Sequence, residues 1–72
     1  MTIGKTLRAL RERAGLSQRR VATLAGISNT YVGAVEAGQR VPTYATARLL
    51  ESAVKASPGA LTSTLPAARR AS

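Results

Sequence analysis

The run of residues 17–38 constrains the fold most, because it indicates two short helices joined by a tight glycine turn. Ser17 and Ser28 are favourable N-caps, and each precedes a stretch whose apolar residues recur at helical spacing. Gly26 stands between the two stretches, where a residue free to adopt a positive φ turns the chain sharply. Ala22 is small enough to let the two helices cross closely. The run therefore predicts a steeply crossed helical pair that exposes the N-terminal half of its second helix.

Apolar residues at three- and four-residue steps predict further helices on both sides of this pair. Thr43 caps one of them, and Pro58 opens a short last helix that Pro66 ends. The predicted helices cover residues 2–14, 18–25, 29–37, 44–55 and 58–64. Their inward-facing residues are Ile3, Leu7, Leu10, Ala14, Val21, Leu24, Ala25, Val32, Val35, Ala47, Leu49, Leu50, Ala53, Val54, Leu61 and Leu65. The sequence thus predicts an all-α fold, a compact five-helix bundle.

The length of 72 residues allows one domain, which we expect to span residues 1–65, with a flexible basic tail over 66–72. The chain has no Cys, so neither a disulfide nor a thiolate metal site can support its small core. No apolar run is long enough to span a bilayer, and the N-terminus lacks the apolar block of a signal peptide. We therefore expect a cytoplasmic protein without membrane contact.

The charge of the chain indicates a class of partner. Lys and Arg number 11 against three acids, which gives a formal net charge of +8, and a field of that sign attracts DNA, RNA or anionic lipid. Catalysis has few side chains to use, because His and Cys are absent, the acids are scattered glutamates and no glycine-rich phosphate loop occurs. We expect a binding protein and not an enzyme, with no metal, no cofactor and no small-molecule ligand.

The segment GLSQRRVATLAGISNTYVGAVEAGQRVPT, residues 15–43, contains Gly-Leu-Ser-Gln, Val-Ala, Ala-Gly-Ile-Ser, Glu-x-Gly and Pro-Thr in succession. With this pattern, residues 3–61 resemble the Cro and phage-repressor (XRE) helix-turn-helix family. The resemblance implies a lambda-repressor-like DNA-binding domain, in which helix 29–37 lies in the major groove of an operator. It also implies sequence-specific binding of double-stranded DNA and a role in transcriptional regulation, such as that of a phage Cro or repressor.

The resemblance further implies two sets of DNA contacts. Asn suits adenine and small apolar groups suit a thymine methyl, so the start of helix 29–37 would face base edges, while helix N-termini bind phosphates. Gln18 would hold a phosphate and brace Asn29. The residues expected at bases are Asn29, Thr30, Gly33 and Ala34. The residues expected at the DNA backbone are Ser17, Gln18, Arg19, Arg20, Ser28, Tyr31, Arg40, Thr43 and Tyr44.

Some of these positions depart from the family pattern or have an ordinary alternative. Gly33 replaces a longer polar side chain that relatives often carry, which leaves few direct base contacts. Arg19 and Arg20 stand where many relatives carry acids, and they could equally form a solvated basic face. Asn29 and Thr30 are also common first-turn residues, and Tyr44 could be an edge of the core. The expected structural residues are Arg11, Ala22, Gly26 and Glu36; the alternative for Arg11 and Glu36 is two unrelated solvated charges.

Since one helix in one groove reads few bases, we expect a homodimer on an inverted repeat, with Leu61 and Leu65 at the dimer surface. One alternative keeps the domain and changes the role, to an antitoxin or a restriction-modification controller. Another is a basic module that binds RNA or anionic membrane without reading sequence. The chain lacks the aromatic residues of single-strand binders, and its basic residues are spread over several helices, which disfavours that alternative.

Overall fold

A computed structural model describes residues 2–66, which form four α-helices and one turn of 3-10 helix. The elements are α1 (Ile3–Arg13), α2 (Gln18–Ala25), α3 (Asn29–Glu36), α4 (Tyr44–Ala53) and η1 (Thr62–Thr64). This part of the chain has no strand, so the predicted all-α class is confirmed, whereas the predicted fifth α-helix is wrong. The tail expected over 66–72 lies, from residue 67 on, outside the described residues.

Both ends of every α-helix follow one local pattern. Each helix starts after a Ser or Thr whose side-chain oxygen accepts the backbone N–H three residues along; these caps are Thr2, Ser17, Ser28 and Thr43. Each helix is followed within two residues by a residue with positive φ. The N–H of that residue and the N–H of the next one donate to carbonyls of the last turn, as in Gly26 N–H to Thr23 O (3.3 Å) and Ile27 N–H to Ala22 O (3.0 Å). Local hydrogen bonding therefore sets the helix boundaries.

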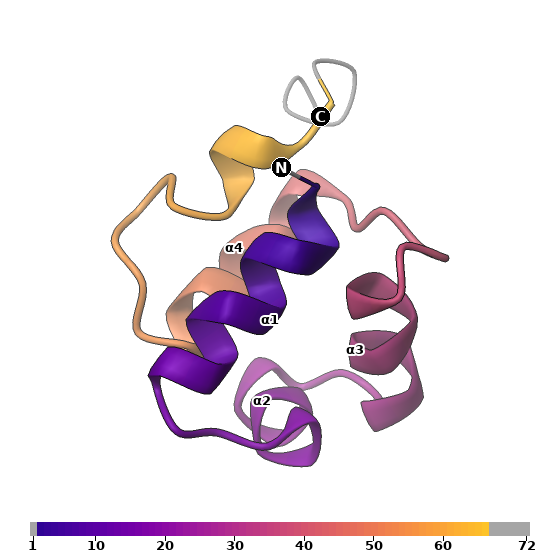
Figure 1. Cartoon of the computed structure of the whole chain (residues 1–72), viewed down its shortest axis with the longest axis vertical. Coiled ribbons are helices and arrows are strands. Elements are labelled where there is room, and N and C mark those ends of the chain that lie inside the picture. Colours follow the sequence, from indigo (N-terminus) through magenta and orange to yellow (C-terminus); the bar gives the residue numbers. More distant parts are fainter. Residues whose placement is uncertain (1, 67–72) are drawn as a thin grey trace.

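The helices pack around one aliphatic core. The α2 helix packs against α3 and α4, α1 packs against α3, and η1 covers α4 and α1 (Figure 1). Figure 1 also shows α3 on one side of the molecule and the segment 54–60 on the other. The buried apolar residues are Ile3, Leu7, Val21, Ala22, Ala25, Val32, Val35, Ala47, Leu50, Ala53, Val54, Leu61 and Leu65. This core fixes α3 by its inner face and leaves its first turn outside.

Several residues expected in the core lie elsewhere. Leu24 and Leu49 are 47% and 49% exposed, because each lies on a flank of its helix that no described element covers. Ala14 is exposed, since α1 ends before it, and Leu10 is only partly buried. Leu61 and Leu65, which we expected at the dimer surface, are instead buried: they are 0% and 2% exposed within the monomer. They fill the core, so they are not available to a second copy.

A buried carboxylate explains why the segment after α4 is not an α-helix. The Glu51 side chain accepts the Leu61 N–H at 2.8 Å, the Thr62 N–H at 2.7 Å and the Thr62 hydroxyl at 3.0 Å, all on Oε2. A helix starting at Pro58 would need the Thr62 N–H for its own ladder. The chain instead forms the 3-10 turn, which places Leu61 and Leu65 against the core.

Acid should weaken the hydrogen bonds that Glu51 accepts from Leu61 and Thr62. Burial raises the pKa of Glu51, but hydrogen bonds from Thr62 and Leu61 outweigh it and leave the pKa below the ordinary value of 4.5. A depressed pKa contributes stability that is present above the unfolded-state pKa and is lost as pH falls through the folded-state pKa. We expect Glu51→Gln to be less stable than the wild type at neutral pH and to lose less stability on acidification, as measured by thermal unfolding. Glu12→Gln, in the exposed part of α1, should keep the wild-type pH dependence; equal acid losses in Glu51→Gln and the wild type would refute the role.

Candidate DNA interface

The first turn of α3 is the most exposed part of that helix. Ser28 caps it by accepting the Tyr31 N–H at 3.0 Å, and Asn29 and Thr30 are both exposed. Further along, Val32 and Val35 are fully buried, which fixes the helix to the core. An eight-residue helix is about 12 Å long, a length that a DNA major groove accommodates. The helix therefore exposes a short polar surface, Asn29 and Thr30, while its buried valines hold it in place.

The remaining residues expected at bases are less accessible. Gly33 and Ala34 are half-buried, one and two residues after the buried Val32. A Cβ at Gly33 would stand 3.4 Å from Gln18 Oε1, so the Gln18 amide lies beside this glycine. The surface that α3 can offer to base edges is thus small and smooth beyond its first turn.

Gln18 has a different partner from the one implied by the family resemblance. Its Nε2 donates to Glu36 Oε1 at 3.1 Å, and no hydrogen bond to Asn29 occurs among the described residues. The buried Glu36 carboxylate attracts the amide, and Gly33 leaves room for it. Gln18 therefore ties the start of α2 to the end of α3.

Arg11 and Glu36 form a partly buried ion pair next to this contact. Arg11 Nε lies 2.6 Å from Glu36 Oε2 and Nη2 lies 3.0 Å from Oε1, a bidentate arrangement. Their side chains are 13% and 4% exposed. The hydrogen bonds that Arg11 donates to Glu36 raise the pKa of Arg11, and Arg11 Nη1 also donates to Leu16 O at 2.9 Å. This pair joins α1 to the end of α3, and Arg11 also joins α1 to the turn that precedes α2.

The residues expected at the DNA backbone divide into two groups. Arg19, Arg20 and Arg40 are exposed and can reach phosphates. Tyr31 and Tyr44 are half-buried and pack against the core, with the Tyr44 hydroxyl 3.5 Å from Arg48 Nη1. The caps Ser17, Ser28 and Thr43 use their side chains inside the fold, but N–H groups of each first turn have no intrahelical partner and can bind an anion.

Sequence reasoning missed two residues near this surface. Arg8, an exposed residue of α1, borders a crevice of about 280 Å³ together with Gln18 and Gly33. Gly4 lies where α1 meets the end of α3, and a Cβ there would collide with the carbonyl oxygens of Val35 and Glu36. The basic face of α1 could have indicated Arg8, whereas no local sequence signal marks Gly4.

The described part of the chain lacks the features of two other kinds of site. No helix within residues 2–66 has the length and apolar character needed to cross a membrane. The same residues contain no cluster of three or more metal-ligating side chains.

Comparisons with known proteins agree with this geometry. The profile of a family described as a helix-turn-helix domain matches residues 2–65. The restriction-modification controller protein C.AhdI from Aeromonas hydrophila has a similar structure, with a TM-score of 0.78 and 41% identity over 82% of this chain and 89% of that one. An HTH_3-family transcriptional regulator from Vibrio cholerae gives a TM-score of 0.77 and 36% identity, over 85% of this chain but only 34% of the regulator.

Comparison with curated proteins gave no significant match. The family match nevertheless covers nearly the whole described chain, and both solved structures share its fold. The chain therefore belongs to the Cro and phage-repressor (XRE) helix-turn-helix family.

Proposed function

We propose that this chain is a transcriptional regulator that binds a double-stranded DNA operator and reads it with α3 in the major groove. The observation that carries the proposal is the exposed polar first turn of α3, held rigid by Val32, Val35 and the Glu36 ion pair. The net charge of +8 supplies the sequence-independent attraction to phosphates. Such a role requires no catalysis and places the protein with DNA in the cytoplasm or nucleoid.

Base reading is assigned to the exposed side of α3. Asn29 and Thr30 reach base edges, and Gly33 and Ala34 let the helix approach the groove closely. Positioning is assigned to the first-turn N–H groups after Ser17, Ser28 and Thr43, to Gln18, Tyr31 and Tyr44, and to the exposed arginines. Those arginines are Arg8, Arg19, Arg20 and Arg40.

Replacing Asn29 by alanine should separate reading from positioning. A binding site is first selected from a pool of random duplexes, and affinities for that site and a scrambled one are then measured by fluorescence anisotropy. We expect Asn29→Ala to lose about 1–3 kcal/mol, or roughly 5- to 150-fold, on the selected site and almost nothing on the scramble. Gln39→Ala, another exposed amide, serves as the control and should change neither affinity. An equal loss on both duplexes would remove Asn29 from base reading.

The chain works, in this proposal, as a homodimer on two half-sites. Since Leu61 and Leu65 are buried, the large apolar side chain that α4 exposes to a second copy is Leu49, which is 49% exposed. Leu49→Glu should shift sedimentation equilibrium towards the monomer, whereas Leu24→Glu, at a residue 47% exposed on α2, should not. If the wild-type chain stays monomeric at high concentration, both free and on DNA, the dimer proposal fails.

A narrower role, the control of restriction-modification genes, is favoured by the 41% identity to the controller C.AhdI over most of both chains. The selected site should then occur upstream of genes for a restriction endonuclease and a methyltransferase beside the gene for this chain. Adjacent genes of another kind, with the site in front of them, would indicate a different regulon.

A further inference from the structure

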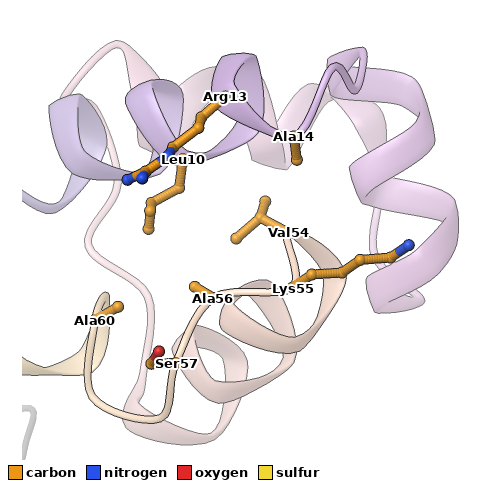
Figure 2. A pocket seen from close by; sticks show the side chains of 8 residues that line it. All are labelled: Leu10, Arg13, Ala14, Val54, Lys55, Ala56, Ser57 and Ala60. Carbon is orange, nitrogen blue, oxygen red and sulfur yellow. The ribbon is translucent and has the colours of Figure 1, made fainter.

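A groove and a crevice border α1. The groove, of about 470 Å³, lies between the last turn of α1 and the segment after α4, where Leu10 and Val54 contribute apolar side chains (Figure 2). The crevice, of about 280 Å³, lies where α1, the start of α2 and the end of α3 meet. Its lining residues are Arg8, Arg11, Gln18, Gly33, Glu36 and Ala37. The crevice adjoins the surface that α3 offers to DNA, because Gly33 belongs to both.

The Gln18 amide in this crevice has a fixed orientation. Its Nε2 donates to Glu36 Oε1 at 3.1 Å, and the Glu36 carboxylate, which Arg11 holds by two hydrogen bonds, can only accept. Turning the amide over would bring its oxygen against a carboxylate oxygen, in a side chain that is only 4% exposed. Electrostatics therefore keep the amide nitrogen at Glu36 and direct the amide oxygen away from it.

This amide oxygen lies beside Gly33 and has no hydrogen-bond partner. A Cβ at Gly33 would stand 3.4 Å from Gln18 Oε1 and 4.0 Å from Gln18 Cδ, so the oxygen is the nearest atom of the amide. Within residues 2–66 the side-chain oxygens that are both buried and unpaired belong to Thr6 and Glu51, so Gln18 Oε1 is unpaired but accessible. The α2 helix thus supplies an accessible acceptor at a point of α3 where glycine provides no side chain.

A DNA duplex offers few partners to such an acceptor. Phosphate and deoxyribose oxygens within a strand are acceptors themselves, so they cannot donate to Gln18 Oε1. In the major groove the donors are the exocyclic amino groups, N4 of cytosine and N6 of adenine. One N–H of Nε2 remains after the bond to Glu36, so a phosphate contact of Gln18 stays compatible with a base contact.

We propose that Gln18 is a specificity-determining residue, whose Oε1 accepts a hydrogen bond from the amino group of one adenine or cytosine beside Gly33. Glu36 is the positioning residue that keeps this oxygen facing the groove. The inference rests on the proposed binding of α3 in the major groove. It adds base reading to a residue for which the family resemblance implies only a phosphate contact and a brace for Asn29.

The first test removes the amino group from the DNA. Each adenine and cytosine of the selected site is replaced in turn by purine or pyrimidinone, which lack the exocyclic amine, and fluorescence anisotropy gives the affinities of the wild type and Gln18→Met. We expect roughly three- to tenfold weaker wild-type binding at one replacement to which Gln18→Met does not respond. Gln39→Ala, at an exposed amide outside the crevice, should respond as the wild type does. If Gln18→Met also responds to every replacement as the wild type does, the inference is wrong.

The second test exchanges the acceptor for a donor. Gln18→Lys can still donate to Glu36, but it presents an ammonium and no oxygen to the DNA. The preferred base at this position should change from adenine or cytosine to guanine or thymine, whose O6 and O4 accept, and fresh selection from random duplexes measures the change. An unchanged selected site, with tighter binding of every duplex, would make Gln18 a phosphate contact alone and would overturn the inference.

These measurements also separate the role of Gln18 from the proposed function. A wild-type chain that binds selected and scrambled duplexes equally would contradict the proposed function itself. A wild-type chain that discriminates between them, together with a Gln18→Met variant that shows the wild-type response to every replacement, would contradict only the role of Gln18. Each comparison is a ratio of two affinities of one protein, so partial unfolding of a variant cancels from it.

Discussion

Glu36→Gln is expected to lower the free energy of unfolding by about 3 kcal/mol, and the Tm by roughly 12 °C or more, although it only replaces a carboxylate oxygen by an amide nitrogen. The variant keeps an oxygen that can accept from Gln18, but it leaves the Arg11 guanidinium, 13% exposed, without a countercharge. Breaking one partner of a buried pair costs more than the pair itself contributes, because the other charge stays desolvated. Urea or thermal unfolding, read by far-ultraviolet circular dichroism, measures the loss.

The matched control is Glu12→Gln, the same substitution in the exposed Arg8–Glu12 pair, whose side chains are 65% and 57% exposed. Solvent screens that pair, so its loss should change stability by no more than about 0.5 kcal/mol. If Glu36→Gln unfolds at the wild-type midpoint, the Arg11–Glu36 pair does not hold α1 and α3 together.

Gly4→Ala is expected to destabilise the domain by about 2–3 kcal/mol, against the ordinary preference of helices for alanine. The new Cβ would collide with the backbone carbonyl oxygen of Val35 and lie 3.0 Å from that of Glu36. Backbone atoms cannot rotate aside as a side chain can, so α1 must move away from α3 and disturb the ion pair between them. Chemical denaturation of the purified chain measures the effect.

Gly33→Ala provides the control, because it makes the same change inside a helix. Its Cβ would meet only the flexible Gln18 side chain, at 3.4 Å. The variant should be as stable as the wild type or up to about 1 kcal/mol more stable. Equal stabilities of Gly4→Ala and Gly33→Ala would show that the close approach of α1 to α3 is not tight.

The helix boundaries could be predicted from the sequence because local hydrogen bonds set them. Ser17, Ser28 and Thr43 cap the helices that were expected to follow them, and Gly26 adopts the positive φ that the turn required. The motif in residues 15–43 also predicted the family correctly, because the family pattern is defined by residue types at fixed spacings.

The errors concern features that are determined by contacts between residues far apart in the sequence. The last helix was predicted from Pro58, but Glu51, up to 11 residues earlier, takes the N–H groups that such a helix would have used. Helical periodicity counted Leu24 and Leu49 as inward-facing, since it does not reveal which flank a neighbouring helix covers.

The candidate site shows the same division. Asn29 and Thr30 are exposed at the start of α3, where the motif placed them. The contact of Gln18 with Glu36 depends on how the start of α2 packs against the end of α3, and the motif contains no information about it. The DNA contacts of these residues stay predictions.

The central claim is that the chain reads DNA sequence, and the affinity ratio between selected and scrambled duplexes tests it most directly. Fluorescence anisotropy across a salt series should give at least about a thousandfold tighter binding of one inverted repeat, with both affinities falling as salt rises. Equal binding of the two duplexes at every salt concentration, with loss of both at high salt, would mean that the net charge of +8 accounts for all the binding and would contradict the account.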